Sequence, residues 1–134
     1  DGVTEQDALL IAQAFIDAGA DIINVSTGQT SHSAKPQPGR MFQTPLSDII
    51  RNDGDIPTIA VGNIYETDHV NSIIAAGRAD LVCLARPHLA DPNWTLHAAA
   101  ELGYQGPGAI EQHQYFLGYR QAHTLAERER EATS

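Results

Sequence analysis

The sequence is poor in basic residues and in cysteine. Its 134 residues include 8 lysines and arginines against 17 acidic residues, which gives a net charge of −9. Nucleic acids and anionic membrane surfaces are bound by clustered lysine and arginine, so the composition argues against both as partners. The single Cys83 excludes an internal disulfide and a zinc site built from cysteines, and it favours a reducing, cytoplasmic compartment.

Other absences narrow the function further. No apolar run approaches the roughly 18 residues that span a bilayer. The sequence contains neither the Gly-x-Gly-x-x-Gly fingerprint of a dinucleotide site nor the Gly-x-Ser-x-Gly elbow of acyl transfer. The six histidines show no His-Glu-x-x-His spacing, so we expect no bound metal. Because the chain opens on Asp1 without a methionine or a signal-peptide pattern, we expect it to be part of a longer one.

Short apolar segments alternate with amphipathic ones, which predicts parallel β-strands connected by helices. We expect strands over 21–25, 56–61 and 80–84, and helices over 4–19, 44–52, 67–76, 93–102 and 110–130. A helix end, a glycine and an aspartate precede both the first and the third strand, which is a weak internal repeat. Such units fit a section of a (β/α)₈ barrel or of a doubly wound sheet.

In both architectures, ligands bind at the carboxyl ends of the strands. The residues that follow the three expected strands are Ser26-Thr27-Gly28, Gly62-Asn63 and Ala85-Arg86. Small residues let the backbone approach a ligand, and Arg86 offers a planar charged fork suited to phosphate. The pattern is equally compatible with a structural role, in which Arg86 pairs with Asp91 and the glycines form turns.

Two further segments are assigned from their composition. The stretch 26–40 is rich in serine, glycine and proline, and we expect it to be a long loop at the rim of the site. Three cationic or titratable side chains of this loop could contact an anionic substrate, although a solvated loop is the simpler interpretation: His32, Lys35 and Arg40. The aromatic residues Tyr115, Phe116 and Tyr119 are expected to pack the tail helix.

Three segments resemble the old yellow enzyme family, the FMN-dependent NAD(P)H:ene oxidoreductases. They are DIINVSTG at 21–28, TIAVGNI at 58–64 and ADLVCLARPHLADP at 79–92. The similarity covers Asp1 to about Gly103. It is nearest to a bacterial branch that includes the reductase half of salicylyl-CoA and 2-aminobenzoyl-CoA hydroxylase/oxidoreductase proteins. The resemblance implies an α/β fold: a C-terminal section of a TIM (β/α)₈ barrel, about strands six to eight, over residues 1–109, and a helical tail over 110–134.

The resemblance also implies that Gly62, Asn63, Ala85 and Arg86 hold the FMN phosphate. The family has a glycine where this chain has Ala85, whose methyl group can still leave the N–H available. The family's catalytic and flavin-facing residues lie upstream, so we expect no catalytic residue in this chain. In some relatives a tail motif carries an arginine into a neighbouring subunit, and the matching position here is Leu117.

The sequence therefore predicts the C-terminal part of an FMN-dependent oxidoreductase. Its reductant would be NADH or NADPH, and its acceptor an activated unsaturated or aromatic-CoA-derived molecule, with a CoA thioester among the candidates. The resemblance adds a monooxygenase half as a possible companion. We expect a cytoplasmic homo-oligomer, and an isolated 134-residue chain that is inactive. Two alternatives stay open: a non-catalytic half-barrel that binds a phosphate ligand, and an assembly segment that completes a partner.

Overall fold

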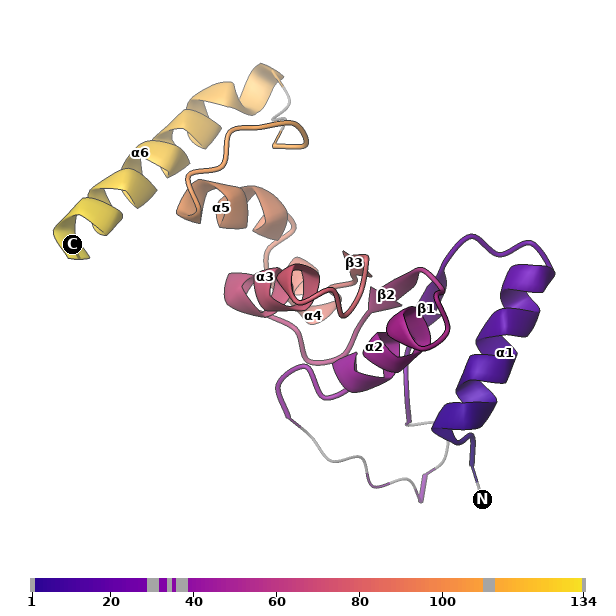
Figure 1. The fold of residues 1–134 in the computed structure, drawn as a ribbon. Coiled ribbons are helices and arrows are strands. Elements are labelled where there is room, and N and C mark those ends of the chain that lie inside the picture. Colours follow the sequence, from indigo (N-terminus) through magenta and orange to yellow (C-terminus); the bar gives the residue numbers. More distant parts are fainter. Residues whose placement is uncertain (1, 29–31, 34, 36–38, 110–112, 134) are drawn as a thin grey trace. The chain divides into compact units, whose positions relative to one another are not determined.

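A computed structural model of the chain describes residues 2–28, 32–33, 35, 39–109 and 113–133 (Figure 1). The chain divides into two compact units, Asp1–Ala85 and Arg86–Ser134, which are described separately. The first unit contains the β-strands, and the described part of the second is built from helices. Of the loop predicted over 26–40, residues 29–31, 34 and 36–38 lie outside the described residues.

The first unit is built on a three-stranded parallel sheet. Its strands are β1 (Ile23–Val25), β2 (Thr58–Ala60) and β3 (Leu81–Val82), in the order β1-β2-β3. Ile23 lies opposite Thr58, and Ala60 lies opposite Val82. All three predicted strands are present, each shorter than expected. Because β2 is central, the residues at its carboxyl end have the ends of β1 and β3 on either side.

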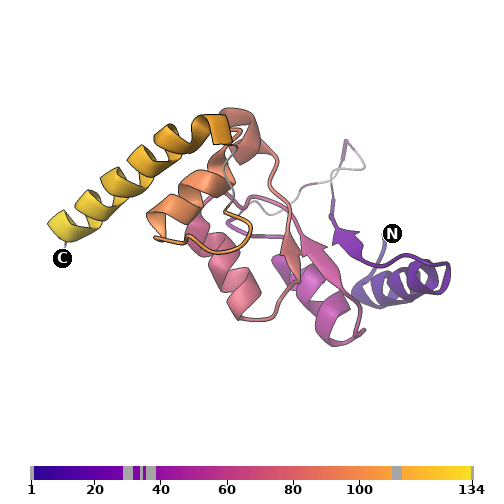
Figure 2. The same cartoon turned by 90° about the horizontal axis from the view of Figure 1, so that it is seen from above.

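Three helices accompany this sheet: α1 (Glu5–Asp17), α2 (Thr44–Asn52) and α3 (Thr67–Ala75). A capping box opens α1. The Thr4 hydroxyl accepts the N–H of Asp7 at 3.2 Å, and the Asp7 carboxylate accepts the N–H of Thr4 at 3.0 Å. Figures 1 and 2 show α1 and α2 side by side next to the sheet.

Two apolar clusters hold the helices on the strands. The first joins α1, α2 and β1 through Ala12, Val25, Ile50 and Ile56, and the second joins β2 and α3 through Ala60, Ile64, Ile73 and Ala79. Both clusters consist of residues with little exposed surface. Because Ala60 ends β2 and Ile64 lies four residues on, the second cluster anchors both sides of the turn that follows β2.

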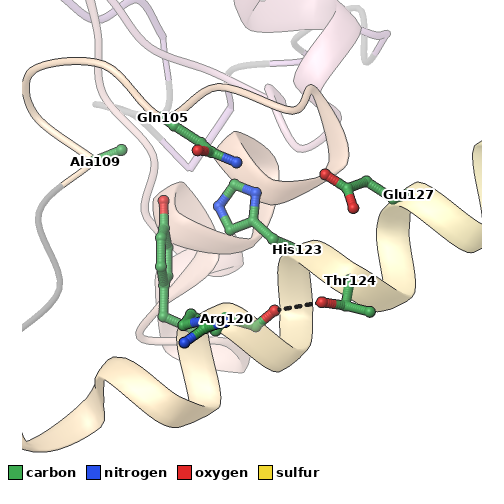
Figure 3. Close-up of a pocket in the computed structure, with 7 residues that line it drawn as sticks. Gln105, Ala109, Arg120, His123, Thr124 and Glu127 are labelled. Atoms are coloured by element: carbon green, nitrogen blue, oxygen red, sulfur yellow. Dashed lines mark hydrogen bonds between the residues drawn. The ribbon is translucent and has the colours of Figure 1, made fainter.

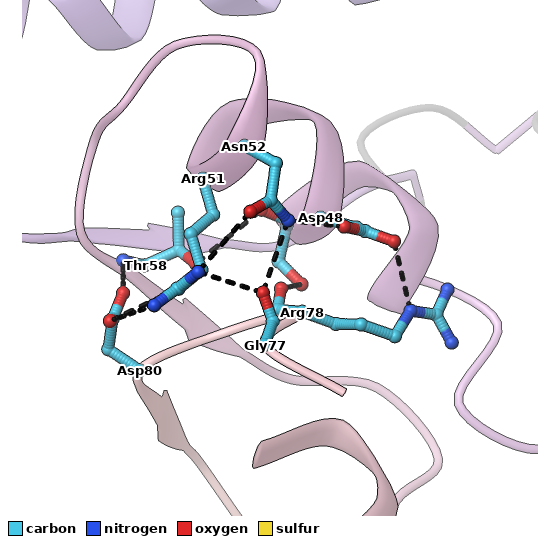
Figure 4. A network of polar contacts seen from close by, with 8 residues as sticks. Asp48, Arg51, Asn52, Thr58, Gly77, Arg78 and Asp80 are labelled. Carbon is cyan, nitrogen blue, oxygen red and sulfur yellow. Dashed lines mark hydrogen bonds and ion pairs between the residues drawn. The ribbon is translucent and has the colours of Figure 1, made fainter. Parts of the chain in front are cut away.

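A polar network ties α2 to the segment between α3 and β3 (Figure 4). The Asp80 carboxylate accepts the Thr58 N–H at 2.9 Å and the Arg51 guanidinium at 3.0 and 3.1 Å. Arg51 Nη1 and Asn52 Nδ2 both donate to the carbonyl oxygen of Gly77, at 2.9 and 3.1 Å. Thr58 opens β2, so this network lies at the amino end of the sheet, where residues of a barrel serve stability.

We predict that Asp80→Asn lowers the free energy of unfolding by about 1–2 kcal/mol at neutral pH. The Thr58 N–H and then the Arg51 hydrogen bonds lower the pKa of Asp80. A carboxyl group whose pKa is lower in the folded state than in the unfolded state, where it is near 3.9, stabilises the folded state. This contribution is fully present when the pH is above the unfolded pKa. The contribution is lost as the pH falls through the folded pKa. The difference from the unchanged protein should therefore shrink below about pH 4.

Urea denaturation at neutral and acid pH measures this effect. Asp53→Asn is a matched control, because Asp53 is an exposed aspartate just after α2 with no side-chain hydrogen bond among the described contacts. We expect that control to change stability by less than about 0.5 kcal/mol. A stability loss in Asp80→Asn that stays constant across the pH range would contradict the proposed cause.

The second unit contains α4 (Arg86–Ala90), α5 (Trp94–Glu101), η1 (His113–Tyr115) and α6 (Phe116–Thr133). The short α4 was not predicted, and α6 continues to Thr133, past the expected end at residue 130. Arg130 explains the difference, because its Nη1 donates to the carbonyl oxygens of Ala100 and Glu101 at the end of α5. No helix in the described part of the chain is long and apolar enough to cross a membrane. The domain boundary predicted after residue 109 stays a prediction.

Candidate functional site

Gly62 and Asn63 form the turn that follows β2, as predicted. Both have positive φ angles, 111° and 53°. The Asn63 side chain donates from Nδ2 to the carbonyl oxygen of Gly39 at 2.8 Å. The Asn63 carbonyl oxygen accepts the N–H of Met41 at 3.2 Å. Asn63 thus ties the end of the long loop to the carboxyl end of the central strand.

A side chain that the sequence analysis missed, Gln43, packs directly on Gly62. A Cβ atom at Gly62 would lie 2.7 Å from Cδ and 2.8 Å from Cγ of Gln43. Gln43 is only 8% exposed, and its Oε1 accepts the N–H of Thr27 at 3.0 Å. Because Thr27 follows β1, Gln43 links the carboxyl ends of two neighbouring strands. The turn can pass this side chain only with a glycine.

His69, in the first turn of α3, contacts the other end of the same turn. Its Nδ1 accepts the N–H of Tyr65 at 3.4 Å, and its Nε2 lies 3.2 Å from Oε2 of Glu66. The Tyr65 and His69 rings meet edge to face, with centroids 4.7 Å apart. Oε2 of Glu66 also lies 4.0 Å from Nη1 of Arg40. The β2–α3 turn, defined as residues 62–65, is therefore held at both ends before any ligand binds.

Ala85 and Arg86 follow β3. The Cys83 N–H donates to the carbonyl oxygen of Ala60 at 2.8 Å, so the chain leaves β3 beside the carboxyl end of β2. Ala85 is exposed and ends the first unit. Arg86 is also exposed, and it is the first residue of the second unit. A joint site formed by all four predicted residues therefore stays a prediction.

The residues at the end of β2 have the chemistry of an anion site. A phosphate bound by backbone N–H groups needs a close approach of the main chain, and Gly62 provides this because Gln43 excludes any Cβ there. Arg86, the first residue of the second unit, carries a planar charged group of the kind that binds phosphate. Among the residues that the structure describes, no three His, Cys, Asp or Glu side chains gather in a way that could hold a metal ion.

The second unit has a pocket of its own, of about 400 Å³ (Figure 3). It is lined by Gln105, Ala109, Tyr119, Arg120, His123, Thr124 and Glu127. Tyr119 packs edge to face on His123 of the same helix, with centroids 4.5 Å apart. Tyr115 and Phe116 are exposed instead, although the Arg120 guanidinium covers the Phe116 ring at 5.3 Å.

Known proteins resemble this chain over most of its length. The model of the NADH:flavin oxidoreductase / NADH oxidase family matches residues 2–105. An NADPH dehydrogenase of Geobacillus sp. (strain WCH70) is 36% identical over 121 residues, which are 90% of this chain and 34% of that protein. An NADPH dehydrogenase of Halalkalibacterium halodurans is 37% identical over 109 residues, 79% of this chain and 32% of the relative.

An NADH oxidase of Thermoanaerobacter brockii is 36% identical over 97 residues, which are 69% of this chain and 15% of that protein. The chain thus spans 34% or less of the length of each of these three relatives. The region matched by the family model contains all three strands and the β2–α3 turn.

Proposed function

Because the chain belongs to the NADH:flavin oxidoreductase / NADH oxidase family, whose members are FMN enzymes built on a (β/α)₈ barrel, we propose that it is the C-terminal section of such a barrel. Its three strands would be about strands six to eight. The sheet order β1-β2-β3 supports this placement, because neighbouring strands of the barrel follow one another along the chain.

In this proposal the chain binds the phosphate of FMN through Gly62, Asn63, Ala85 and Arg86. The observation that carries it is the contact between Gln43 and Gly62, which leaves main chain rather than side chain at the end of β2. FMN supplies the hydride-transfer chemistry when it is bound, and the protein positions it. The exposed Arg86 guanidinium would neutralise phosphate charge with two parallel hydrogen bonds.

The whole enzyme would use NADH or NADPH as reductant and an activated unsaturated or aromatic small molecule, such as a CoA thioester, as acceptor. The names of the relatives, NADPH dehydrogenase and NADH oxidase, support the oxidoreductase and give no support to a monooxygenase half. A homo-oligomer in the cytoplasm is part of the same proposal. The 134-residue chain alone would be inactive, since no catalytic residue is assigned to it.

Binding of FMN and of riboflavin to the chain tests this proposal. The two flavins share the same ring system, and riboflavin lacks the phosphate. If the chain binds the phosphate, FMN fluorescence should be quenched at a concentration at least about tenfold lower than riboflavin fluorescence. A difference in affinity of about tenfold corresponds to one charge-assisted contact. Flavin fluorescence measures both. Equal affinity for the two flavins, or no binding of either, would contradict a phosphate-binding site in this chain and would favour a purely structural segment.

A further inference from the structure

We propose that His69 is a positioning residue for the β2–α3 turn, because its Nδ1 accepts the N–H of Tyr65. The consequence for FMN binding rests on the proposed function, in which this turn contacts the phosphate. The arrangement of the turn itself is independent of any ligand, so the two statements can be tested separately.

The geometry singles out His69 among the residues near the turn. The side chain is 4% exposed, and its Nδ1 lies 3.4 Å from the Tyr65 nitrogen. The edge-to-face contact with the Tyr65 ring, at 4.7 Å between centroids, holds the imidazole plane. A buried ring with one fixed acceptor can set the position of a neighbouring main-chain segment. Gln43 does the same at Gly62, the opposite end of the turn.

The hydrogen bond determines where the imidazole carries its proton. A ring nitrogen that accepts a hydrogen bond has no proton, so a neutral His69 carries its proton on Nε2. Nε2 lies 3.2 Å from Oε2 of Glu66, within ion-pair distance but not aligned as a hydrogen bond. Oε2 of Glu66 also lies 4.0 Å from Nη1 of Arg40.

Removal of the Nδ1 acceptor would disrupt the turn. The Tyr65 N–H would then lose the partner that lies 3.4 Å away. The far end of the turn would loosen, and the phosphate-binding main chain would lose part of its preorganisation.

Two substitutions separate positioning from bulk packing. His69→Asn places an amide oxygen near the position of Nδ1, so it keeps an acceptor. His69→Leu keeps an apolar side chain of similar length and removes the acceptor. We expect the protection of the Tyr65 amide against hydrogen exchange to fall about five- to tenfold in His69→Leu and to remain in His69→Asn. The amide of Cys83, bonded to Ala60, is the internal control.

FMN affinity provides the second readout. It should weaken in His69→Leu and stay close to that of the unchanged chain in His69→Asn, because only the leucine variant lacks an acceptor for the Tyr65 N–H. A structural role alone would lower the stability of the whole unit in both variants and would not be rescued by asparagine.

The outcomes distinguish the two proposals. If Tyr65 exchange is the same in His69→Leu and in the unchanged chain, the positioning role is wrong, whether or not FMN binds. If Tyr65 exchange responds as expected and FMN does not bind, the positioning role stands and the proposed function of the turn fails. If Tyr65 exchange and FMN affinity change together, and asparagine restores both, the two proposals are supported.

Discussion

Gly62→Ala is expected to lower the free energy of unfolding by about 2–6 kcal/mol. The φ angle of 111° at Gly62 is one that alanine adopts only with strain of about 1–3 kcal/mol. The new Cβ would also lie 2.7 Å from Cδ of Gln43, a closer approach than packed carbon atoms allow. Gln43 cannot move away easily, because it is buried and bonded to the Thr27 N–H. Overpacking of this kind costs about 1–3 kcal/mol more.

Chemical denaturation of single and double variants separates the two contributions. Gln43→Ala removes the obstacle, so it should relieve the overpacking part of Gly62→Ala while the backbone strain remains. We expect an interaction energy of about 1–3 kcal/mol in the double-mutant cycle. Gly118→Ala is the matched control, because Gly118 lies within α6 with no atom near its Cβ position, and alanine there should stabilise the helix by up to about 1 kcal/mol. Strict additivity of the Gly62 and Gln43 changes would show that the contact is unimportant.

The helices and strands of the first unit could be predicted from local pattern, apart from the strand lengths. The bounds of α2 are those predicted, because Pro45 favours the first turn of a helix and Asp53-Gly54 favours its end. The strand predicted over 56–61 is paired only over Thr58–Ala60. Ile56 is 3% exposed although it lies outside the ladder. The apolar sequence pattern therefore predicted which residues are buried. Buried residues extend beyond those that pair with a neighbouring strand.

In the second unit, local pattern failed where long-range contacts decide the structure. The tail helix was expected to end at residue 130, and α6 continues to Thr133. Arg130 in fact donates to carbonyl oxygens at the end of α5, about 30 residues earlier. The short α4, which was not predicted, has Pro87 in its first turn, where proline is well accommodated.

The same distinction applies to the candidate site. Gly62 and Asn63 were found because a glycine and an asparagine directly after an apolar strand form a local pattern. Gln43 and His69 were missed because their partners are main-chain N–H groups, of Thr27 and of Tyr65, which every sequence contains. Only the fold determines which N–H group a side chain reaches. Residues that would bind a ligand can thus be predicted from the sequence more easily than residues that position them.

The contacts of the positioning residues imply that the β2–α3 turn is rigid where it would meet the cofactor. Gln43 fixes Gly62, the Asn63 side chain fixes Gly39, and His69 fixes Tyr65, so three contacts from two other segments define four residues. A phosphate that binds a preformed turn does not bear the entropy cost of ordering it. The remaining cost of binding is then mainly that of placing the negative charge, and an arginine is suited to compensate it.

Arg86→Ala is accordingly expected to weaken FMN binding by about 10- to 150-fold, which corresponds to the loss of about 1.5–3 kcal/mol from a charge-assisted contact. Arg86→Lys should recover part of the loss, because lysine keeps the charge and cannot form two parallel hydrogen bonds with one phosphate. Riboflavin binding should be unaffected by either change, since the contact is with the phosphate. Flavin fluorescence titration of the three proteins with both flavins gives the comparison.

Arg128→Ala provides the matched control for charge. It removes one positive charge from an exposed position of α6, so it changes the net charge of −9 by the same amount as Arg86→Ala. If Arg86 acts by direct contact, Arg128→Ala should change FMN affinity by less than about twofold at physiological ionic strength, because distant exposed charges are screened. Equal losses in the two variants would mean that Arg86 acts only through the general electrostatic field. Equal losses of FMN and riboflavin in Arg86→Ala would mean that it supports the fold rather than the phosphate.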